Sequence, residues 1–428
     1  MPDTEPESTY QVRTLVAPSG ERLLWVTDST GSYHLGINAF YLWRLRRGGA
    51  SVNTLRIKLL ALCRFHEWLD ANGIDLDERT LAATFLSPDE VDALREHLRT
   101  NRTRPRQAVP SARTQRLLRA AGAGNPIPRR PEPRPHVNAN RWRSNCTAVR
   151  DYVVWAADKA IHRIQAGDAD DAARYVAATE RRERFIEAMS SDFPEPAASG
   201  RQGLDDAELG CLLALVDPRS ERNPFEPAQR VRNHTVLRIL LETGLRIGEL
   251  LGLKGGDLRL EGPEPYIMVH RRADDPEDPR KDQPLAKTEA HPKPVTRELA
   301  SLLVQWVGTE RRLYPGAKRT PFVFLSRKGG PISNDAVEDM FRILRAAEPA
   351  LPAGLSAHVL RHTANDRFSA AADQAGWRDN VEQQVRNLVM GWKKHSATAE
   401  IYTARHTRRK ANEITLRLQG LGSGEDAR

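Results

Sequence analysis

Residues 231–253 read VRNHTVLRILLETGLRIGELLGL, and this stretch decides the fold of the carboxyl-terminal half. Apolar residues recur at helical spacing on both sides of Gly244, and glycine tolerates the left-handed backbone with which helices commonly end. The stretch therefore predicts two helices with a break at Gly244. Arg246 falls in the first turn of the second helix, and Glu249 lies three residues further on, on the same helical face. An arginine and a glutamate at this spacing usually form a salt bridge, so the pair alone indicates no function.

The rest of this half is predicted to be mostly helical with a small β component. Two apolar, β-prone runs, YIMVH at 266–270 and FVFLS at 322–326, predict strands, and a Gly-Gly turn signal follows the second run. Helical patterns predict further helices over 205–216, 334–345, 356–371, 380–390 and 409–418.

The amino-terminal half begins with residues 10–27, which predict two short strands around a Pro-Ser-Gly-Glu turn. Residues 33–101 follow a helical pattern, in which one segment has apolar residues at spacings of three and four: Leu55, Leu59, Leu62, Phe65 and Leu69. Ser87 and Glu90 have the spacing of a capping box, so a helix is expected to begin there. Helical periodicity resumes near Asn140.

These patterns predict a mainly α protein with a small β component. Residues 1–30 form a short hairpin-like segment, 31–190 a helical domain, 191–203 a linker, and 204–428 a mixed α/β domain that ends in a tail helix. The linker is placed at 191–203 because residues 190–203 are polar and interrupted by proline and glycine.

Composition excludes several classes of protein. The chain has 428 residues, 39% of them hydrophobic and 28% charged, which is typical of globular domains. No run approaches the roughly 18 apolar residues that cross a bilayer, and the polar, acidic start is not a secretory signal. The three cysteines are far apart and match neither a metal site nor a disulfide framework. A cytoplasmic protein with no membrane partner is expected.

The net charge of +9 comes from one segment. Residues 99–143 contain twelve arginines, seven prolines, no lysine and one acidic residue. Such a segment cannot build a core, and it is either an arm that lies along a phosphate backbone or a solvated loop. The arginines taken as candidate DNA contacts are Arg99, Arg102, Arg104, Arg106, Arg113, Arg116, Arg119, Arg141 and Arg143.

A second group of candidate residues lies in AHVLRHTAND, at 357–366. His358 and Arg361 share a helical face, and His362 lies one turn after His358. His-x-x-x-His spacing occurs in zinc sites, but no third Cys, His or acidic ligand is evident and the zincin glutamate is absent from this motif. We therefore expect no metal.

Taken together and in order, four motifs resemble those of the tyrosine recombinase (phage integrase) family. They are Thr-Gly-Leu-Arg-Ile-Gly-Glu around Arg246, Ala-Lys-Thr at 286–288, His-x-x-Arg-His at 358–362 and Glu-Ile-Tyr-Thr at 400–403. The resemblance covers about 205–415 as a catalytic domain and extends more loosely over 33–165, which is similar to the family's helical core-binding domain.

The resemblance implies a role for each motif residue. Arg246 and Arg361 would bind the scissile phosphate, since a guanidinium can pair with nonbridging oxygens in bidentate fashion. Tyr402 would attack phosphorus to form a 3′-phosphotyrosyl link. His358 would assist proton transfer, and Lys287 would protonate the leaving 5′-oxygen. Glu249 would support the site. Neither metal nor ATP is needed, because the phosphotyrosine conserves the bond energy.

Three features depart from the family's pattern. The family often follows its lysine with an arginine before the next strand, where TEAHPKPV at 288–295 offers only Lys293. The other two departures concern a residue before the nucleophile and its spacing. Trp392 stands where the family usually has histidine. It lies ten residues before Tyr402 where nine are common, so His395 is an alternative donor to the phosphate, and Trp392 is alternatively a core residue. Lys281 is a rival to Lys287 as general acid. Lys287 is favoured because a general acid must be held rigidly, here between paired strands.

The expected function is site-specific recombination of DNA by an integrase or transposase. A type IB topoisomerase-like activity and a non-catalytic DNA-binding relative are the alternatives. The expected partner is double-stranded DNA, bound by a homotetramer on paired sites, with accessory DNA-bending or element-encoded proteins as further candidates. A short apolar stripe within 411–421 either docks on a neighbouring protomer or folds back on its own domain. When bound to DNA, the cytoplasmic protein would be associated with the nucleoid.

Overall fold

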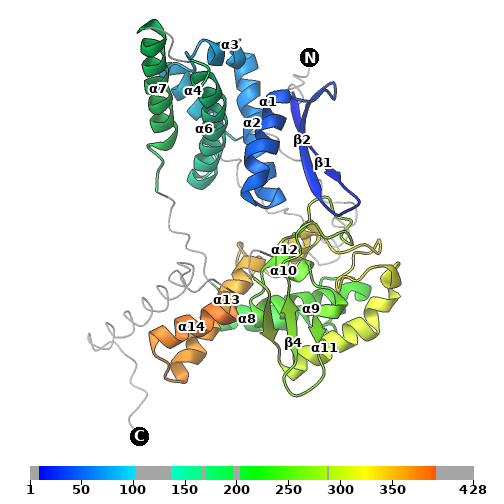
Figure 1. Cartoon of the computed structure of the whole chain (residues 1–428). Helices are drawn as coiled ribbons and strands as arrows, with labels where there is room; N and C mark the ends of the chain where they lie inside the picture. The colour runs from blue at the N-terminus through cyan, green and yellow to red at the C-terminus, as the bar shows by residue number, and fades with distance from the viewer. Residues whose placement is uncertain (1–8, 102–135, 165–168, 196–202, 287–288, 392–428) are drawn as a thin grey trace, which may run out of the picture. The chain divides into compact units, whose positions relative to one another are not determined.

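The structure is a computed structural model that describes residues 9–101, 136–164, 169–195, 203–286 and 289–391. Within them the chain is mainly helical with few strands, which confirms the predicted fold class (Figure 1). The described residues divide into two compact units, an amino-terminal one that ends by residue 195 and a carboxyl-terminal one that begins at residue 203. No helix in the described ranges is long and apolar enough to cross a membrane.

The amino-terminal unit is a group of helices with one hairpin. Its elements are β1 (Tyr10–Val16), β2 (Arg22–Asp28), α1 (Leu35–Phe40), α2 (Val52–Ala71), α3 (Leu76–Leu81), α4 (Pro88–Arg99), α6 (Ala139–Ile161) and α7 (Ala169–Ser190). The two strands pair antiparallel around the predicted turn. The apolar positions predicted for α2 are buried, and the capping box of α4 joins Ser87 and Glu90 in both directions.

The carboxyl-terminal unit combines helices with a three-stranded sheet of order β3-β4-β5. Its elements are α8 (Asp206–Val216), α9 (Pro227–Thr243), α10 (Ile247–Leu251), β3 (Leu258–Arg259), β4 (Tyr266–Val269), β5 (His291–Pro294), α11 (Arg297–Gly308), α12 (Asn334–Ala347), α13 (Ala357–Gln374) and α14 (Asp379–Val389). β4 pairs antiparallel with β3 and with β5.

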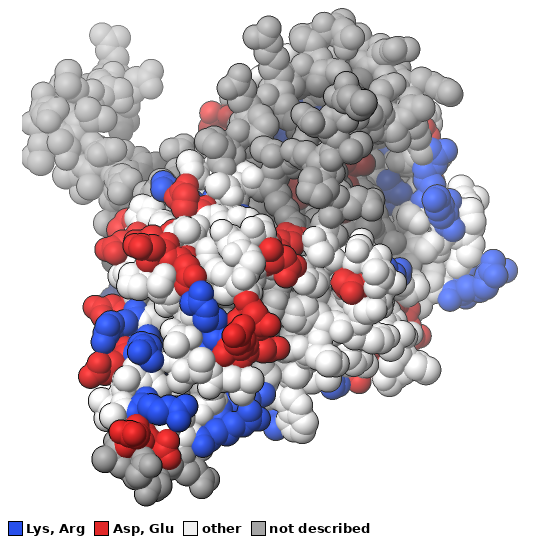
Figure 2. Space-filling model, turned by 90° about the horizontal axis from the view of Figure 1, so that it is seen from above, with Lys and Arg blue, Asp and Glu red and all other residues white. Residues whose placement is uncertain are grey.

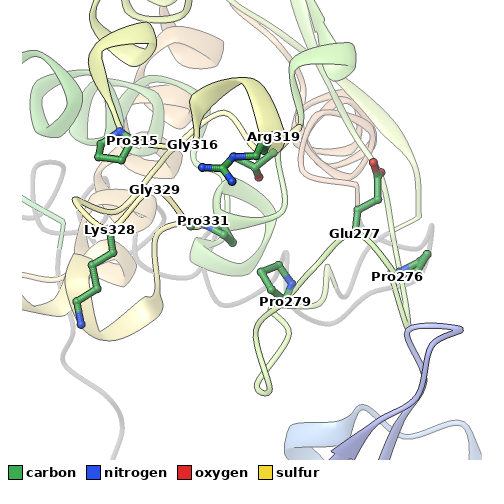
Figure 3. A pocket seen from close by; sticks show the side chains of 11 residues that line it. Pro276, Glu277, Pro279, Pro315, Gly316, Arg319, Lys328, Gly329 and Pro331 are labelled. Carbon is green, nitrogen blue, oxygen red and sulfur yellow. The ribbon is translucent and has the colours of Figure 1, made fainter.

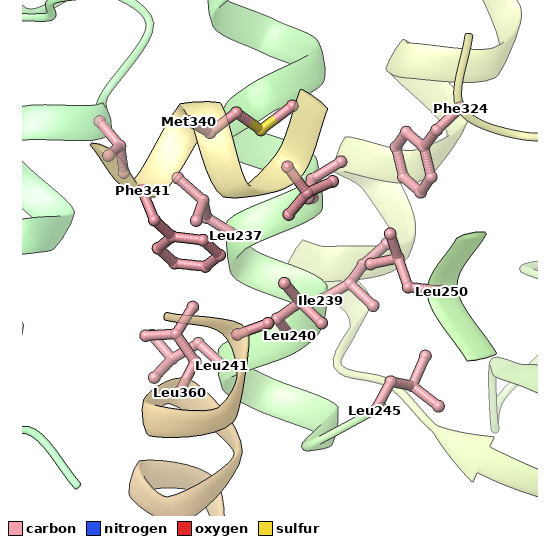
Figure 4. Packing of buried hydrophobic residues seen from close by; sticks show 14 of the residues in the cluster. Leu237, Ile239, Leu240, Leu241, Leu245, Leu250, Phe324, Met340, Phe341 and Leu360 are labelled. Carbon is pink, nitrogen blue, oxygen red and sulfur yellow. The ribbon is translucent and has the colours of Figure 1, made fainter. Parts of the chain in front are cut away.

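The central element of this unit is α9. Leu237, Ile239, Leu240 and Leu241 of this helix are all buried, because other elements pack around it. Figure 4 shows them among Phe341 and Met340 of α12, Leu360 of α13 and Leu250 of α10. The end of α9 is therefore held from several sides, and this end carries the Gly244 break.

The strand predicted at 322–326 was wrong. The run makes only isolated bridges, from Phe322 to Lys254 and from Leu325 to Pro331. All four apolar residues of the run, 322–325, are buried, so they fill core space as irregular chain rather than extending a sheet. The third strand of the sheet is β5, which was not predicted. The tail helices predicted over 409–418 and 411–421 lie outside the described residues.

Candidate active site

The turn between α9 and α10 is the centre of the candidate site. α9 ends at Thr243, and Gly244 follows with φ of 62°, the left-handed conformation expected from the sequence. There is little room at Gly244, because a Cβ atom would lie 3.2 Å from the Cβ of Ala364 and 3.4 Å from the Cε of Met390. The turn thus packs against α13 and the end of α14. Arg246, the last residue of the turn, is the N-cap of α10.

Glu249 fixes Arg246 at two points. Its Oε2 accepts the backbone N–H of Arg246 at 2.8 Å, and its Oε1 accepts the guanidinium NH1 at 3.2 Å. The Glu249 side chain is 1% exposed and that of Arg246 is 27% exposed. The buried carboxylate therefore holds the arginine while part of the guanidinium remains exposed to solvent.

Arg361 reaches the same turn from α13. Its side chain is buried, and its NH1 donates to the backbone carbonyl of Gly244. Two arginines 115 positions apart in the sequence are thus anchored on one three-residue turn. The structure brings together Arg246, Glu249 and Arg361, as the sequence predicted.

His358 lies on α13 three residues before Arg361 and is exposed. Its Nε2 lies 3.0 Å from Nε2 of the buried His362, and the two rings cross at 83°. One ring must donate and the other accept, so His362 fixes the orientation of His358. The His-x-x-Arg-His motif alone indicated no such role for His362. In the described ranges no group of three or more His, Cys, Asp or Glu side chains is placed to hold a metal ion.

Two further residues belong to the site: His291, which the sequence did not indicate, and Lys293, which the sequence indicated only as standing where the family often has an arginine. β5 alternates buried and exposed positions, so His291 and Lys293 share the buried face and the two prolines the other. Lys293 is 1% exposed and its Nζ donates to the Thr243 carbonyl at 3.1 Å. The pattern H-P-K-P could have indicated this shared face, because alternate residues of a strand point the same way.

The electrostatics of these two residues reflect their surroundings. Burial, together with the positive charges of Arg361 and Arg246, lowers the pKa of Lys293 to about 7, although Glu249 opposes the shift. Burial also lowers the pKa of His291, against a hydrogen bond from its Nδ1 to the Glu289 carbonyl at 2.8 Å. That bond places the proton on Nδ1 and leaves Nε2 as an acceptor in neutral His291.

The remaining predicted site residues can be placed only in part. Lys287, Trp392, His395 and Tyr402 lie outside the described residues. Position 287 falls in the connection between β4 and β5, and Leu285, two residues earlier, packs on α10, where a Cβ at Gly248 would lie 3.2 Å from its carbonyl oxygen. The rival, Lys281, is exposed in the same connection.

Gly391, the residue before Trp392, lies directly against His291. Its φ is +63°, and a Cβ there would be 2.4 Å from Cε1 of the imidazole. Gly376 also follows a helix, with φ of +68°, but a Cβ there meets nothing within 4 Å.

This pair predicts the outcome of two substitutions. Gly376→Ala should cost about 1 kcal/mol of stability, the price of a left-handed alanine. Gly391→Ala should cost about 1–3 kcal/mol more, because the methyl group meets the imidazole ring. Thermal unfolding of the full chain measures both. In the double variant with His291→Ala the extra cost should largely disappear, and equal costs for the two glycine variants would contradict the packing described.

Three of the arginines taken as DNA contacts are described, and two of them pack against aromatic rings. The guanidinium carbon of Arg99 lies 5.2 Å from the ring centroid of Trp142, and that of Arg143 lies 5.4 Å from that of Phe193. The third is Arg141, and the other six lie outside the described residues. On the face seen in Figure 2, acidic and basic side chains are interspersed. Most of the arginines in the segment 99–143, and so most of its excess positive charge, lie outside the described residues.

A hollow of about 490 Å³ lies elsewhere in the carboxyl-terminal unit. Pro276, Glu277 and Pro279 contribute one part of its lining (Figure 3). The rest comes from residues 315, 316, 319, 320 and 328–331. Arg319 and Lys328 give it two positive charges, but none of the predicted site residues that the structure describes lines it.

Comparison with known proteins agrees with the motifs. Residues 216–409 match the Phage integrase family, a range that includes all six predicted catalytic positions. The tyrosine recombinase XerD of Mycobacterium leprae (strain TN) is 26% identical over 172 residues, which are 39% of this chain and 49% of that protein. The chain thus spans about half the length of this relative.

Solved structures are also similar. The XerH site-specific recombinase bound to palindromic difH substrate is 17% identical with a TM-score of 0.49, over 86% of this chain and 81% of that one. The Tn1549 transposon integrase in complex with circular intermediate DNA is 18% identical with a TM-score of 0.41, over 76% and 92%. Residues 216–409, a little under half of the chain, are therefore the part whose sequence matches the Phage integrase family.

Proposed function

We propose that this protein is a site-specific DNA recombinase of the integrase or transposase type. The observation that carries the proposal is the anchoring of Arg246 and Arg361 on one turn, with Glu249 fixing the first and the Gly244 carbonyl holding the second. Two guanidinium groups held in this way suit the nonbridging oxygens of a phosphodiester, and their positive charge stabilises the charge that develops as phosphorus is attacked.

The remaining steps follow from the family's motifs. Tyr402 attacks the phosphate and forms the 3′-phosphotyrosyl link, and His358, oriented by His362, assists transfer of the proton. Lys287 protonates the leaving 5′-oxygen. Trp392, or His395 in its place, donates to the phosphate. Neither metal nor ATP takes part.

The partner is double-stranded DNA, which a homotetramer brings together at paired sites with or without accessory proteins. The helical region at 31–190 serves as the core-binding domain, and the arginine-rich run at 99–143 grips the backbone. Twelve arginines against one acidic residue support that placement, because arginines that neutralise phosphates release counterions. The protein acts in the cytoplasm, on the element that carries its gene.

Strand exchange distinguishes this function from the alternatives. The substrates are two duplexes made from the DNA that flanks the gene, with its repeats; we call them flank duplexes. A recombinase should join strands from both duplexes without ATP or metal. Relaxation of supercoiled DNA without joint products would favour the topoisomerase-like alternative, and binding without cleavage would favour a non-catalytic relative.

A further inference from the structure

Lys293 is a buried cation with few partners. It is 1% exposed, and its Nζ donates to the carbonyl of Thr243 and lies 3.5 Å from the sulfur of Met390. In the ranges that the structure describes, no carboxylate oxygen lies within 4 Å of this nitrogen. Burying a charged ammonium without a paired charge is costly, so its retention in the core calls for a reason other than stability.

The groups around Lys293 make its position more costly still. Arg361 on α13, and Arg246 and Glu249 at the start of α10, are near enough for their charges to act on the pKa of Lys293, and His291 lies on the same face of β5. Three cations thus share one carboxylate, and Glu249 already pairs with Arg246. The cluster has an excess of positive charge that an anion entering the site would balance.

The contacts of Lys293 also place it at the end of α9, next to the turn on which the two arginines are anchored. Thr243 is the last residue of α9, and its carbonyl belongs to the negative end of that helix, where a cation is favoured. Met390, the other contact, packs against Gly244 and precedes the Gly391-Trp392 segment. One ammonium therefore joins the two chain segments that lead to Arg246 and to Trp392.

On the basis of the proposed function, we propose that Lys293 is a positioning residue of the phosphate site. Its ammonium holds the end of α9 behind Arg246 and supplies a third positive charge that the bound DNA phosphate balances. Lys293→Met should then keep the stability of the chain but slow DNA cleavage, because methionine fills a similar volume without the buried charge. Lys293→Arg keeps the charge at every working pH.

Stability of the full chain without DNA tests the first half. The low pKa of folded Lys293, about 7 against 10.5 when exposed, means that the unfolded chain binds more protons between these values. The free energy of unfolding should rise with pH across this window in the wild type relative to Lys293→Met, which lacks the titrating group. Lys293→Met should also unfold at a temperature equal to or above that of the wild type at pH 6. A clear loss of stability would show a merely structural role and overturn the proposal.

Covalent cleavage of a flank duplex tests the second half. At pH 7 Lys293→Met should form adduct about ten- to a hundredfold more slowly than the wild type, and Lys293→Arg should stay within a few-fold. At limiting DNA, the wild-type rate should fall from pH 7 to pH 9 relative to that of Lys293→Arg. Wild-type rates in Lys293→Met, or no rescue by arginine, would overturn the proposal. A wild type that forms no adduct would refute the recombinase function instead, and the unfolding measurements would still decide the role of Lys293.

Discussion

Replacing Arg361 with alanine is expected to lower the rate of covalent DNA cleavage by about 10²- to 10³-fold, the loss typical when a preorganised donor to a developing negative charge is removed. Arg361 is buried and anchored on the Gly244 carbonyl, so its guanidinium does not need to reorganise during the reaction. The measurement is the single-turnover rate of adduct formation on a flank duplex.

Two further variants make this result interpretable. Arg367 lies on the same helix, α13, but is exposed, so Arg367→Ala should cleave at nearly the wild-type rate. Arg361→Lys keeps the charge without the planar fork and should recover only part of the loss. Circular dichroism would verify that each variant is folded. If folded Arg361→Ala cleaved within tenfold of the wild type, the phosphate site would have to lie elsewhere.

Much of the fold could be predicted because its signals are local. The capping box at Ser87, the periodicity of α2 and the Gly244 break each depend on residues within one or two helical turns, and all were found where the sequence placed them. The run at 322–326 failed because burial of a short apolar segment does not distinguish a strand from irregular core chain.

β5 was missed because prolines usually argue against a strand. In this strand they occupy alternate, exposed positions at the edge of the sheet. The backbone N–H of Val295 donates to the carbonyl of Pro265, so the backbone N–H and C=O groups of the odd-numbered residues of β5 point toward β4. The backbone nitrogens of Pro292 and Pro294, which carry no hydrogen, therefore point toward the open edge of the sheet. Proline is tolerated at such positions.

The site was predictable to the extent that its residues belong to motifs. Arg246, Glu249 and Arg361 were found together, although a sequence pattern cannot show that one turn anchors both arginines. His291 belongs to no motif, Lys293 stands where the family often has an arginine but received no role, and His362 is only the last residue of the His-x-x-Arg-His motif. Their contribution comes from tertiary contacts, between β5 and the end of α9 and between two rings on α13. Such contacts appear only when the chain is folded.

Tyr402→Phe is expected to abolish the covalent protein–DNA adduct, because phenylalanine lacks the oxygen that bonds to phosphorus. Binding of the same duplex should be nearly unchanged, since the substitution removes one hydroxyl group and no positive charge. Tyr314→Phe is the matched control: its hydroxyl donates to the Ala228 carbonyl in the same unit, and its loss should leave adduct formation intact.

The most direct measurement is the identity of the residue that carries the DNA. A nicked flank duplex traps the adduct, because the strand beyond the cut diffuses away and cannot be rejoined. After proteolysis, mass spectrometry should find the nucleotide on the peptide that contains Tyr402, linked through a 3′-phosphate, and no adduct with Tyr402→Phe. An adduct on Tyr266 or Tyr314, or one that persists in Tyr402→Phe, would contradict the proposed recombinase mechanism.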